Sequence, residues 1–206
     1  MQHRHFIIHK PFGYISQFVC DKKKKKLLGE LYDFPVGTMA IGRLDEGSEG
    51  LLLLTTDGLV SEQVRSCKVE KEYYAQVDGL ISDAAIAQLQ QGVLIGIEGT
   101  HYRTKPCIAS RLTADPGFAE RSRRIRDDRH GPTSWVSITL TEGKNRQVRK
   151  MTAAVGFPTL RLVRVRIGAI QLGDMSQGAV QEVTEFALSP ALFNQAVIPH
   201  SCSESP

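Results

Sequence analysis

Several common sequence signatures are absent from this chain of 206 residues. Its cysteines, Cys20, Cys67, Cys107 and Cys202, lie far apart and form neither a CxxC pair nor a metal-ligand spacing. This spacing argues against a disulfide framework, and we expect reduced thiols. No apolar run approaches the about 20 residues of a membrane span, and the first residues, MQHRHFIIHKPFG, lack a signal-peptide pattern. We therefore expect a cytoplasmic protein with no membrane partner.

Familiar catalytic motifs are missing too. The sequence holds no P-loop, no HExxH, no GxSxG and no convincing GxGxxG motif. His3, His5 and His9 are spaced for one face of a strand, but no cysteine or carboxylate joins them. Surface histidines are therefore favoured over a metal site. A catalytic site in this chain must be built from carboxylates, aromatic residues and arginines.

Acidic residues are absent from one long segment. No Asp or Glu occurs between Gly143 and Gly173, a window that holds Lys144, Arg146, Arg149, Lys150, Arg161, Arg164 and Arg166. A second basic cluster covers residues 121–129, diluted by two aspartates, and a third is Lys22 to Lys26. Any one cluster suits a solvated face. Three clusters in a chain whose net charge is only +4 favour a polyanionic partner, above all a nucleic acid.

The hydrophobic pattern predicts strands and helices that are interspersed along the chain. Strands are expected at residues 6–10, 51–54, 71–77, 135–141 and 160–167, helices near 27–32, 57–66, after Ser82, near 148–155 and from Ser189, and a loop over 113–133. Short connections between some strands favour an α/β fold of the α+β type, with a central mixed, mostly antiparallel sheet flanked by helices. In the last strand, Leu and Val alternate with Arg, which predicts one apolar and one basic face. We expect one domain over residues 5–199 and a flexible tail over 200–206.

The stretch Gly42 to Asp57, GRLDEGSEGLLLLTTD, organises the rest of the chain. Its glycines permit a sharp turn beside Asp45, and its leucines predict a buried strand. A polar hairpin leading into a core strand is an equally good interpretation from spacing alone. If the turn is catalytic, Asp45 is the best nucleophile candidate. By composition alone, Glu46 and Glu49 suit an acid and base pair.

Two further residues have two interpretations each. Tyr73 lies on a predicted strand, where its ring can stack on a base, but a core tyrosine fits the pattern equally well. Arg149 is the best candidate to pair with a buried carboxylate, although an arginine of this kind more often contacts a phosphate.

Four motifs in order resemble those of the pseudouridine synthases. GRLDEGSEGLLLLTTDG at Gly42 to Gly58 is similar to the family signature GRLDxxSxGLLLLTxDG. KEY at Lys71 to Tyr73 is similar to the KxY segment of the family. EGKNRQVRKM at Glu142 to Met151, followed by RLVRVRIG at Arg161 to Gly168, resembles the third motif, and HKPFG at His9 to Gly13 the opening KPxG element. The GKNRQVRKM form resembles the RsuA-type branch. We expect no N-terminal S4 domain, which many members of that branch carry, because the motifs begin almost at the first residue.

The resemblance implies a pseudouridine synthase fold and the isomerisation of uridine in RNA, within the branch most like members that act on 23S rRNA. Asp45 would be the catalytic aspartate, Tyr73 the base-stacking tyrosine, Arg149 the arginine that ion-pairs with Asp45, and Leu162 the apolar floor. Further substrate contacts are expected from Arg43, Lys71 and Arg146, and RNA-backbone contacts from Lys144, Lys150, Arg161, Arg164 and Arg166. Glu46 and Glu49 would be loop residues. Glu46 also departs from the basic or neutral residue that is more usual after the aspartate.

The reaction that the resemblance implies breaks the C1′–N1 glycosidic bond, rotates the uracil and rejoins it through C5. No cofactor or metal is expected, because the broken bond is remade and no group is supplied from outside. The alternatives are a synthase acting on tRNA or 16S rRNA, and a non-catalytic rRNA-binding or assembly factor. A monomer is the default expectation, because no coiled coil or apolar patch is evident.

Overall fold

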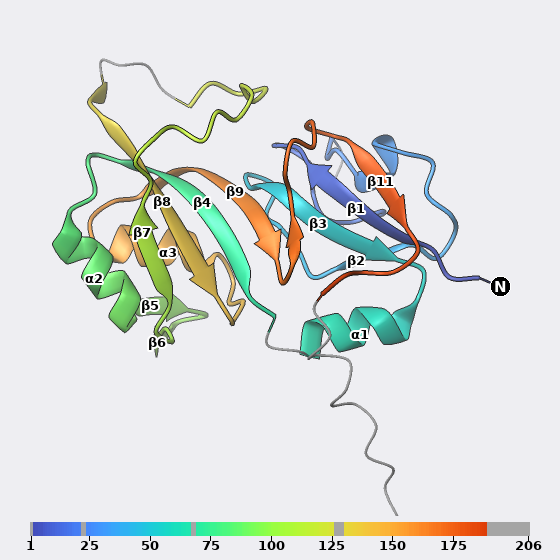
Figure 1. Ribbon diagram of the computed structural model, residues 1–206, viewed down its shortest axis with the longest axis horizontal. Helices are drawn as coiled ribbons and strands as arrows, with labels where there is room; N and C mark the ends of the chain where they lie inside the picture. The colour runs from blue at the N-terminus through green and yellow to red at the C-terminus, as the bar shows by residue number, and fades with distance from the viewer. Residues whose placement is uncertain (1, 22–23, 67–68, 126–129, 189–206) are drawn as a thin grey trace, which may run out of the picture.

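A computed structural model describes residues 2–21, 24–66, 69–125 and 130–188 (Figure 1). The described strands of the main sheet are β1 (His5–Lys10), β2 (Met39–Ile41), β3 (Glu49–Thr55), β4 (Lys71–Asp78), β7 (Ile108–Arg111), β8 (Thr133–Leu140), β9 (Thr159–Ile167), β10 (Ile170–Gln171) and β11 (Val180–Val183). A separate hairpin pairs β5 (Leu94–Ile97) with β6 (Thr100–Arg103). The helices are the short 3-10 helix Leu28–Glu30, α1 (Gly58–Ser66), α2 (Asp83–Gln91) and α3 (Gln147–Ala154).

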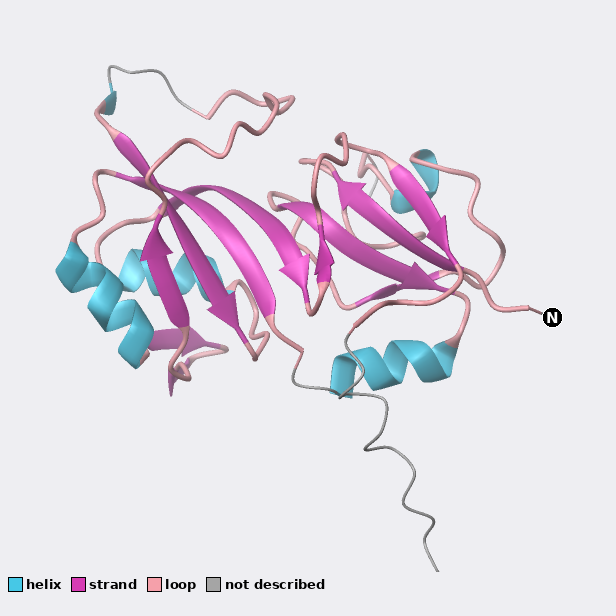
Figure 2. Ribbon diagram, viewed as in Figure 1, coloured by secondary structure: helices cyan, strands magenta, loops and turns pink. Residues whose placement is uncertain are grey.

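The main sheet is mixed and mostly antiparallel, as the sequence predicts. Its order is β11-β1-β3-β9-β4-β8-β7, with β2 paired to β3 and β10 to β9. Only the contact between β3 and β9 is parallel among the described pairs. Figure 2 shows α1 beside β2 on one side of the molecule and α2 beside β7 on the other, whereas α3 packs against β5, β9 and β4. None of the described helices is long and apolar enough to cross a membrane.

The strand β3 is buried on both faces. Leu51 and Leu53 belong to one apolar cluster, with α1 and β10, whereas Leu52 and Leu54 belong to another, with β1. A strand that is covered on both faces has a continuous run of apolar residues, because no side chain needs to face water. This explains the four consecutive leucines. The turn that carries Asp45 is therefore anchored to a rigid strand.

A third apolar cluster lies under the other half of the sheet. Ala75 and Val77 of β4 pack there against Ile86 and Leu89 of α2. As predicted from the sequence, α2 begins after Ser82, whose Oγ accepts a hydrogen bond from the Ala85 amide at 3.2 Å.

Gly50 lies where β3 pairs with β9 and so where the two halves of the main sheet meet. It has φ +106°, and a Cβ at this position would lie 2.3 Å from the Arg164 carbonyl oxygen of β9. Glycine is required here because any side chain would push β3 away from β9. This close approach sets the Asp45 turn directly beside the start of β9.

The structure confirms the predicted strands and most of the helices. The helix expected near residues 27–32 is only a 3-10 turn at Leu28–Glu30. The sequence pattern did not predict β2, β5, β6, β7, β10 and β11 as separate strands. The predicted basic face of β9 is wrong, because Arg161 and Arg164 are only 5% and 3% exposed. The alternating residues of the predicted strand 135–141 are typical of a half-buried strand, but Trp135 to Leu140 of β8 are all buried. The helix predicted from Ser189 and the tail lie outside the described residues.

Candidate active site

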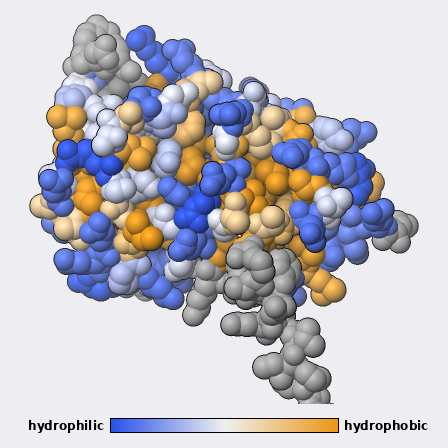
Figure 3. Space-filling view, in the orientation of Figure 1, coloured by the Kyte–Doolittle hydropathy of each residue, from blue (hydrophilic) through white to orange (hydrophobic). Residues whose placement is uncertain are grey.

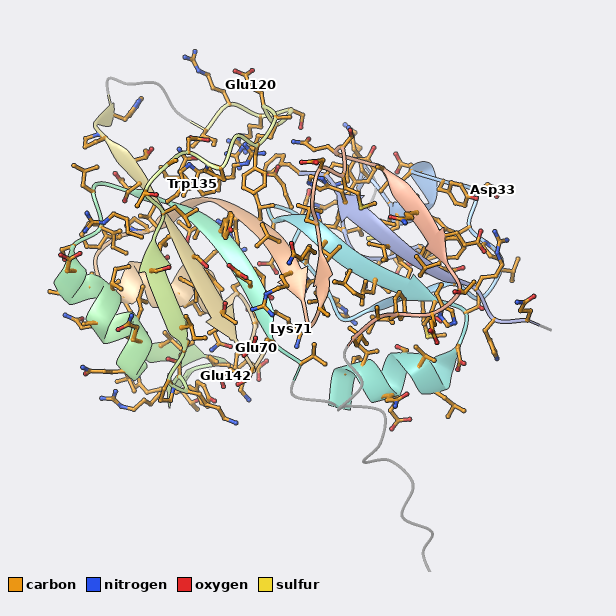
Figure 4. The ribbon with its side chains drawn as sticks, viewed as in Figure 1. Asp33, Glu70, Lys71, Glu120, Trp135 and Glu142 are labelled. Carbon is orange, nitrogen blue, oxygen red and sulfur yellow. The ribbon has the colours of Figure 1, made fainter. Side chains whose placement is uncertain are left out.

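A cleft opens between the turn before β3, the strands β4 and β9, and the start of α3. A cavity of about 70 Å³ in it is lined by Arg43, Leu44, Asp45, Ser48, Tyr73, Leu140, Glu142, Gly143, Lys144, Arg146, Gln147, Val148 and Leu162. A second cavity, of about 410 Å³, shares part of this lining and extends to Lys71 and Arg164. We call the two together the Asp45 cleft. Figure 4 shows Lys71 and Glu142 near one another at the start of β4, and both line the larger cavity.

The turn that presents Asp45 is held by backbone hydrogen bonds. The Ser48 amide donates to the Asp45 carbonyl at 3.0 Å, which closes the turn. The hydroxyl of Ser16 bridges the amide and carbonyl of Leu44, at 2.9 and 2.8 Å. The Gly13 amide donates to the Glu46 carbonyl at 2.8 Å. The segment after β1 therefore fixes both sides of Asp45, whose side chain is 32% exposed in the cleft.

Two arginines from the start of α3 reach the turn. Arg146 Nη1 lies 3.4 Å from Asp45 Oδ2. Arg149 instead donates to the Gly47 carbonyl at 2.6 Å and to the Thr159 carbonyl at 3.3 Å. The ion pair expected between Asp45 and Arg149 is thus formed by Arg146, while Arg149 ties the turn to β9. Burial lowers the pKa of Arg149, as does the charge of Arg146, and the charge of Asp45 raises it.

Arg146 has an unusual backbone that a polar network supports. It is the N-cap of α3, with φ +52° in the left-handed region that few non-glycine residues adopt. The Lys144 amide donates to the side-chain oxygen of Gln147, whose amide donates to Glu142. Glu142 also accepts from the Tyr102 hydroxyl. Burial would raise the pKa of Glu142, but the hydrogen bonds from Tyr102, a backbone amide and Gln147 lower it.

Tyr73 and Leu162 complete the cleft opposite Asp45. Tyr73 is half-buried on β4 and packs against the apolar cluster below it, so it takes part in the core and also lines the cavity. Leu162 is 5% exposed and lies on β9 in the same wall. The structure therefore brings together a carboxylate, an aromatic ring, an apolar side chain and a guanidinium.

Comparison with known proteins identifies the family of this chain. A family model described as "RNA pseudouridylate synthase" matches residues 4–154. The chain belongs to the RNA pseudouridylate synthase family. "Ribosomal large subunit pseudouridine synthase E" of Xanthomonas campestris is 40% identical over 189 residues, which cover 90% of this chain and 98% of the relative. The protein of the same name from Vibrio parahaemolyticus is also 40% identical, over 89% of this chain and 75% of the relative.

Solved structures show the same fold. A crystal structure described as that of pseudouridylate synthase matches with a TM-score of 0.71 and 25% identity, over 88% of this chain and 70% of that chain. Human RNA Pseudouridylate Synthase Domain Containing 1 matches with a TM-score of 0.52 over 92% of this chain and 82% of that chain. At 18% identity, the human structure supports the fold alone.

The arginines of β9 do not form the exposed RNA-binding face that the sequence predicts. Arg161 binds Glu49 through two hydrogen bonds, at 3.0 and 2.8 Å, and both side chains are buried. Arg164 Nε donates to a backbone carbonyl of β3 at 2.7 Å. Arg166 pairs with Glu72 at 2.9 Å. In this synthase β9 has both faces covered, and Glu49 is a buried partner of Arg161 rather than a loop residue.

The other residues that were predicted to contact RNA differ in exposure and in location. Arg43 and Lys144 are exposed and line the cleft, and Lys150 is half-exposed on α3. Lys71 donates to the Val69 carbonyl at 2.8 Å. Burial lowers the pKa of Lys71, and the charge of Arg164 lowers it further. Lys71 and Arg164 together bring two cations to the larger cavity.

Lys10 is a site-supporting residue that reasoning from the sequence missed. Its side chain is fully buried, and Nζ donates to the Pro11 and Tyr14 carbonyls at 2.9 and 2.6 Å. Burial lowers its pKa to about 8, although the charges of Glu49 and Asp45 oppose this. The HKPFG motif was the available signal, because this lysine shapes the turn that contacts the Asp45 turn.

The histidines of β1 lie inside the molecule rather than on its surface. His5 and His9 are 8% and 5% exposed. Their Nδ1 atoms lie 2.9 Å from the Thr55 hydroxyl and 2.7 Å from the Met175 carbonyl. Within the described ranges no group of three His, Cys, Asp or Glu side chains is placed to hold a metal.

Proposed function

We propose that this synthase converts a specific uridine of 23S rRNA to pseudouridine in the cytoplasm, with Asp45 as the catalytic aspartate. The observation that carries the proposal is the position of Asp45. A rigid turn presents its carboxylate into a cleft whose other walls are Tyr73, Leu162 and Arg146. The relatives named as acting on the large ribosomal subunit support the choice of substrate.

The chemistry assigns a task to each of these groups. The target uridine leaves the RNA stack at a cost of a few kcal/mol, which stacking on Tyr73 and packing on Leu162 offset. The Asp45 carboxylate acts at the C1′–N1 bond, either as a nucleophile or by stabilising positive charge on the sugar. The uracil then turns, C5 bonds to C1′, the C5 proton is released and N1 gains a proton. The guanidinium of Arg146, 3.4 Å from Asp45 Oδ2, holds the carboxylate in the cleft.

The test maps pseudouridine in transcripts of 23S rRNA, 16S rRNA and tRNA, by carbodiimide adducts that stop primer extension. We expect one stop in 23S rRNA with the wild type and none with Asp45→Asn, which keeps the size of the side chain. Glu46→Gln is the matched control, because Glu46 is the adjacent carboxylate and pairs with Lys25 on the surface. It should retain activity.

Three results would overturn parts of this proposal. Conversion by Asp45→Asn at the wild-type rate would remove Asp45 from the reaction. A stop only in 16S rRNA or tRNA would keep the reaction and change the substrate. Tight binding to 23S rRNA with no conversion of any RNA would favour a non-catalytic rRNA-binding factor.

A further inference from the structure

A cavity of about 920 Å³ lies apart from the Asp45 cleft and shares none of its lining residues. It is lined by Arg121, Arg123, Arg124 and Arg161, together with Phe118 and Gln76. We call it the arginine groove. Its volume is in the range of ligand sites of about 300–1,000 Å³, so it can hold at least one nucleotide. Figure 3 shows hydrophilic side chains over the loop before β8, at the upper edge of this face.

The loop that carries these arginines is docked on the sheet. The Asp115 carboxylate accepts a hydrogen bond from Trp135 Nε1 at 3.2 Å. The Phe118 ring lies 5.6 Å from the Trp135 ring and 6.1 Å from the Tyr74 ring. The Ala119 carbonyl accepts from Arg161 at 2.9 Å. These contacts hold residues 115–119 against the sheet, and such preorganisation lowers the entropic cost of binding.

Among the described residues that line the groove, four are arginines and one, Glu120, is acidic. Arg161 is neutralised by Glu49. In the part of the chain that the structure describes, no acidic side chain is paired with Arg123 or Arg124, and both are exposed. Glu120 is an acidic residue of the lining, and Figure 4 shows it on the outer part of the loop. Such a surface suits a polyanion.

One polar atom in the floor of the groove lacks a partner. The Gln76 amide nitrogen donates to the Thr133 hydroxyl at 3.0 Å, whereas Gln76 Oε1 is buried without a hydrogen bond. A buried acceptor without a donor costs about 1–3 kcal/mol. A ligand that carries both anionic groups and hydroxyl donors satisfies the arginines and this oxygen together. The sugar-phosphate backbone of RNA has both, because each ribose bears a 2′-hydroxyl.

The groove borders the turn that carries Asp45. The Arg121 guanidinium lies over the Phe12 ring, 4.6 Å from its centre. A methyl group on Gly47 would lie 3.8 Å from the same ring and 3.9 Å from Arg149 Nη2. Arg121 also donates to the Leu160 carbonyl at 3.5 Å, next to the residue that accepts from Arg149. Phe12 and the Asp45 turn therefore lie where the two sites come close together.

We propose that the arginine groove binds the backbone of the substrate RNA a few nucleotides away from the target uridine. Phosphates contact Arg121, Arg123 and Arg124, and a ribose hydroxyl donates to Gln76. This inference rests on the proposed function for its substrate. Such contacts fix the register and orientation of a long RNA on the protein from outside the reaction cleft.

The test compares Arg123→Gln/Arg124→Gln with the control Arg103→Gln/Arg111→Gln. The control removes the same charge from β6 and β7, away from the groove. Affinity is measured against salt concentration, in an Asp45→Asn background, for a long 23S fragment and for a short stem-loop that holds the target uridine. Loss of two phosphate contacts should reduce the slope of log K against log salt by about 1.5 for the long RNA.

Conversion by the same charge variants with active Asp45 provides a second readout. We expect a higher KM and unchanged kcat with the long RNA, no effect with the stem-loop, and wild-type behaviour of the control. An unchanged slope and KM for the groove variant would overturn the inference, as would equal losses in the control. Failure of the wild type to convert any RNA would count against the proposed function, whereas the binding slopes would still decide the groove.

Discussion

At the residue scale, Arg146 and Arg149 lie three positions apart in one motif but bind different groups. Arg146 reaches the Asp45 carboxylate from a left-handed backbone, and Arg149 binds backbone carbonyls of the turn and of β9. The first contact bears on charge in the cleft. The second bears on the position of the turn. This division predicts that substitutions at the two positions separate activity from stability.

Arg146→Gly should lower kcat/KM by about tenfold, since a charged hydrogen bond contributes on the order of 1.5 kcal/mol. Glycine tolerates φ +52°, so the free energy of unfolding should stay the same or rise by up to about 1 kcal/mol.

Arg149→Gln should lower both kcat/KM and stability, the latter by about 1–3 kcal/mol, because the Gly47 carbonyl loses its donor. Urea denaturation and steady-state kinetics measure both. Wild-type kcat/KM in Arg146→Gly would contradict this assignment.

Lys10 predicts a dependence of stability on pH. Its pKa is about 8 in the folded protein, against an ordinary value of 10.5. Below pH 8 the Lys10 side chain is protonated in both the folded and the unfolded protein, and burial of its charge destabilises the folded state fully. Between these values the unfolded state binds more protons, so stability rises with pH. The free energy of unfolding of the wild type should therefore rise between about pH 8 and pH 10.5, relative to that of Lys10→Met. Parallel curves for the two proteins would contradict the shift.

The sequence could predict the cleft residues better than their supporting contacts. Asp45, Tyr73 and Leu162 lie in motifs, and the family resemblance places those motifs around one site. The partner of Arg161 could not be predicted, because Glu49 lies 112 positions away and a strand pattern carries no information about ion pairs across a sheet. The choice between Arg146 and Arg149 depends on one left-handed backbone, which the sequence pattern does not specify.

At the element scale, β9 shows what an alternating pattern of apolar and charged residues cannot predict. Its period of two was predicted, but alternation alone cannot distinguish a strand with one face in water from one covered on both faces. β9 lies between β3 and β4, and its pairing with β4 shifts register near Tyr73 and again near Val77. These irregularities place Leu162 and Arg164 along the wall of the Asp45 cleft, and Arg161 in the arginine groove.

Gly50→Ala should test how strictly the contact between β3 and β9 is required. The added methyl group meets the Arg164 carbonyl at 2.3 Å, and φ is +106°. Backbone strain and overpacking together should lower the free energy of unfolding by roughly 3 kcal/mol or more. Gly42→Ala is the matched control, because its φ is +72° and a Cβ there meets nothing within 4 Å. It should lose only about 1 kcal/mol. Equal losses in thermal or urea unfolding would contradict the steric argument.

At the scale of the whole molecule, one continuous sheet places the Asp45 cleft and the arginine groove near its centre. α2 lies beyond β7, at one end of the sheet, and contacts neither site. The apolar clusters that support the sheet lie under different parts of it, and β9 links the halves. An RNA that occupies both sites should therefore cover the middle of the molecule and leave the α2 end free.

Hydrogen exchange with and without RNA should show this footprint. With a long 23S fragment bound to Asp45→Asn, exchange should slow at residues 43–48, at the start of α3 and at residues 118–125. α2 provides the internal control, and its exchange should not change, because it lies away from both sites. A short stem-loop that fills only the Asp45 cleft should protect residues 43–48 and α3 but not residues 118–125. Protection of α2, or the same pattern with both RNAs, would contradict a path that runs from the cleft into the groove.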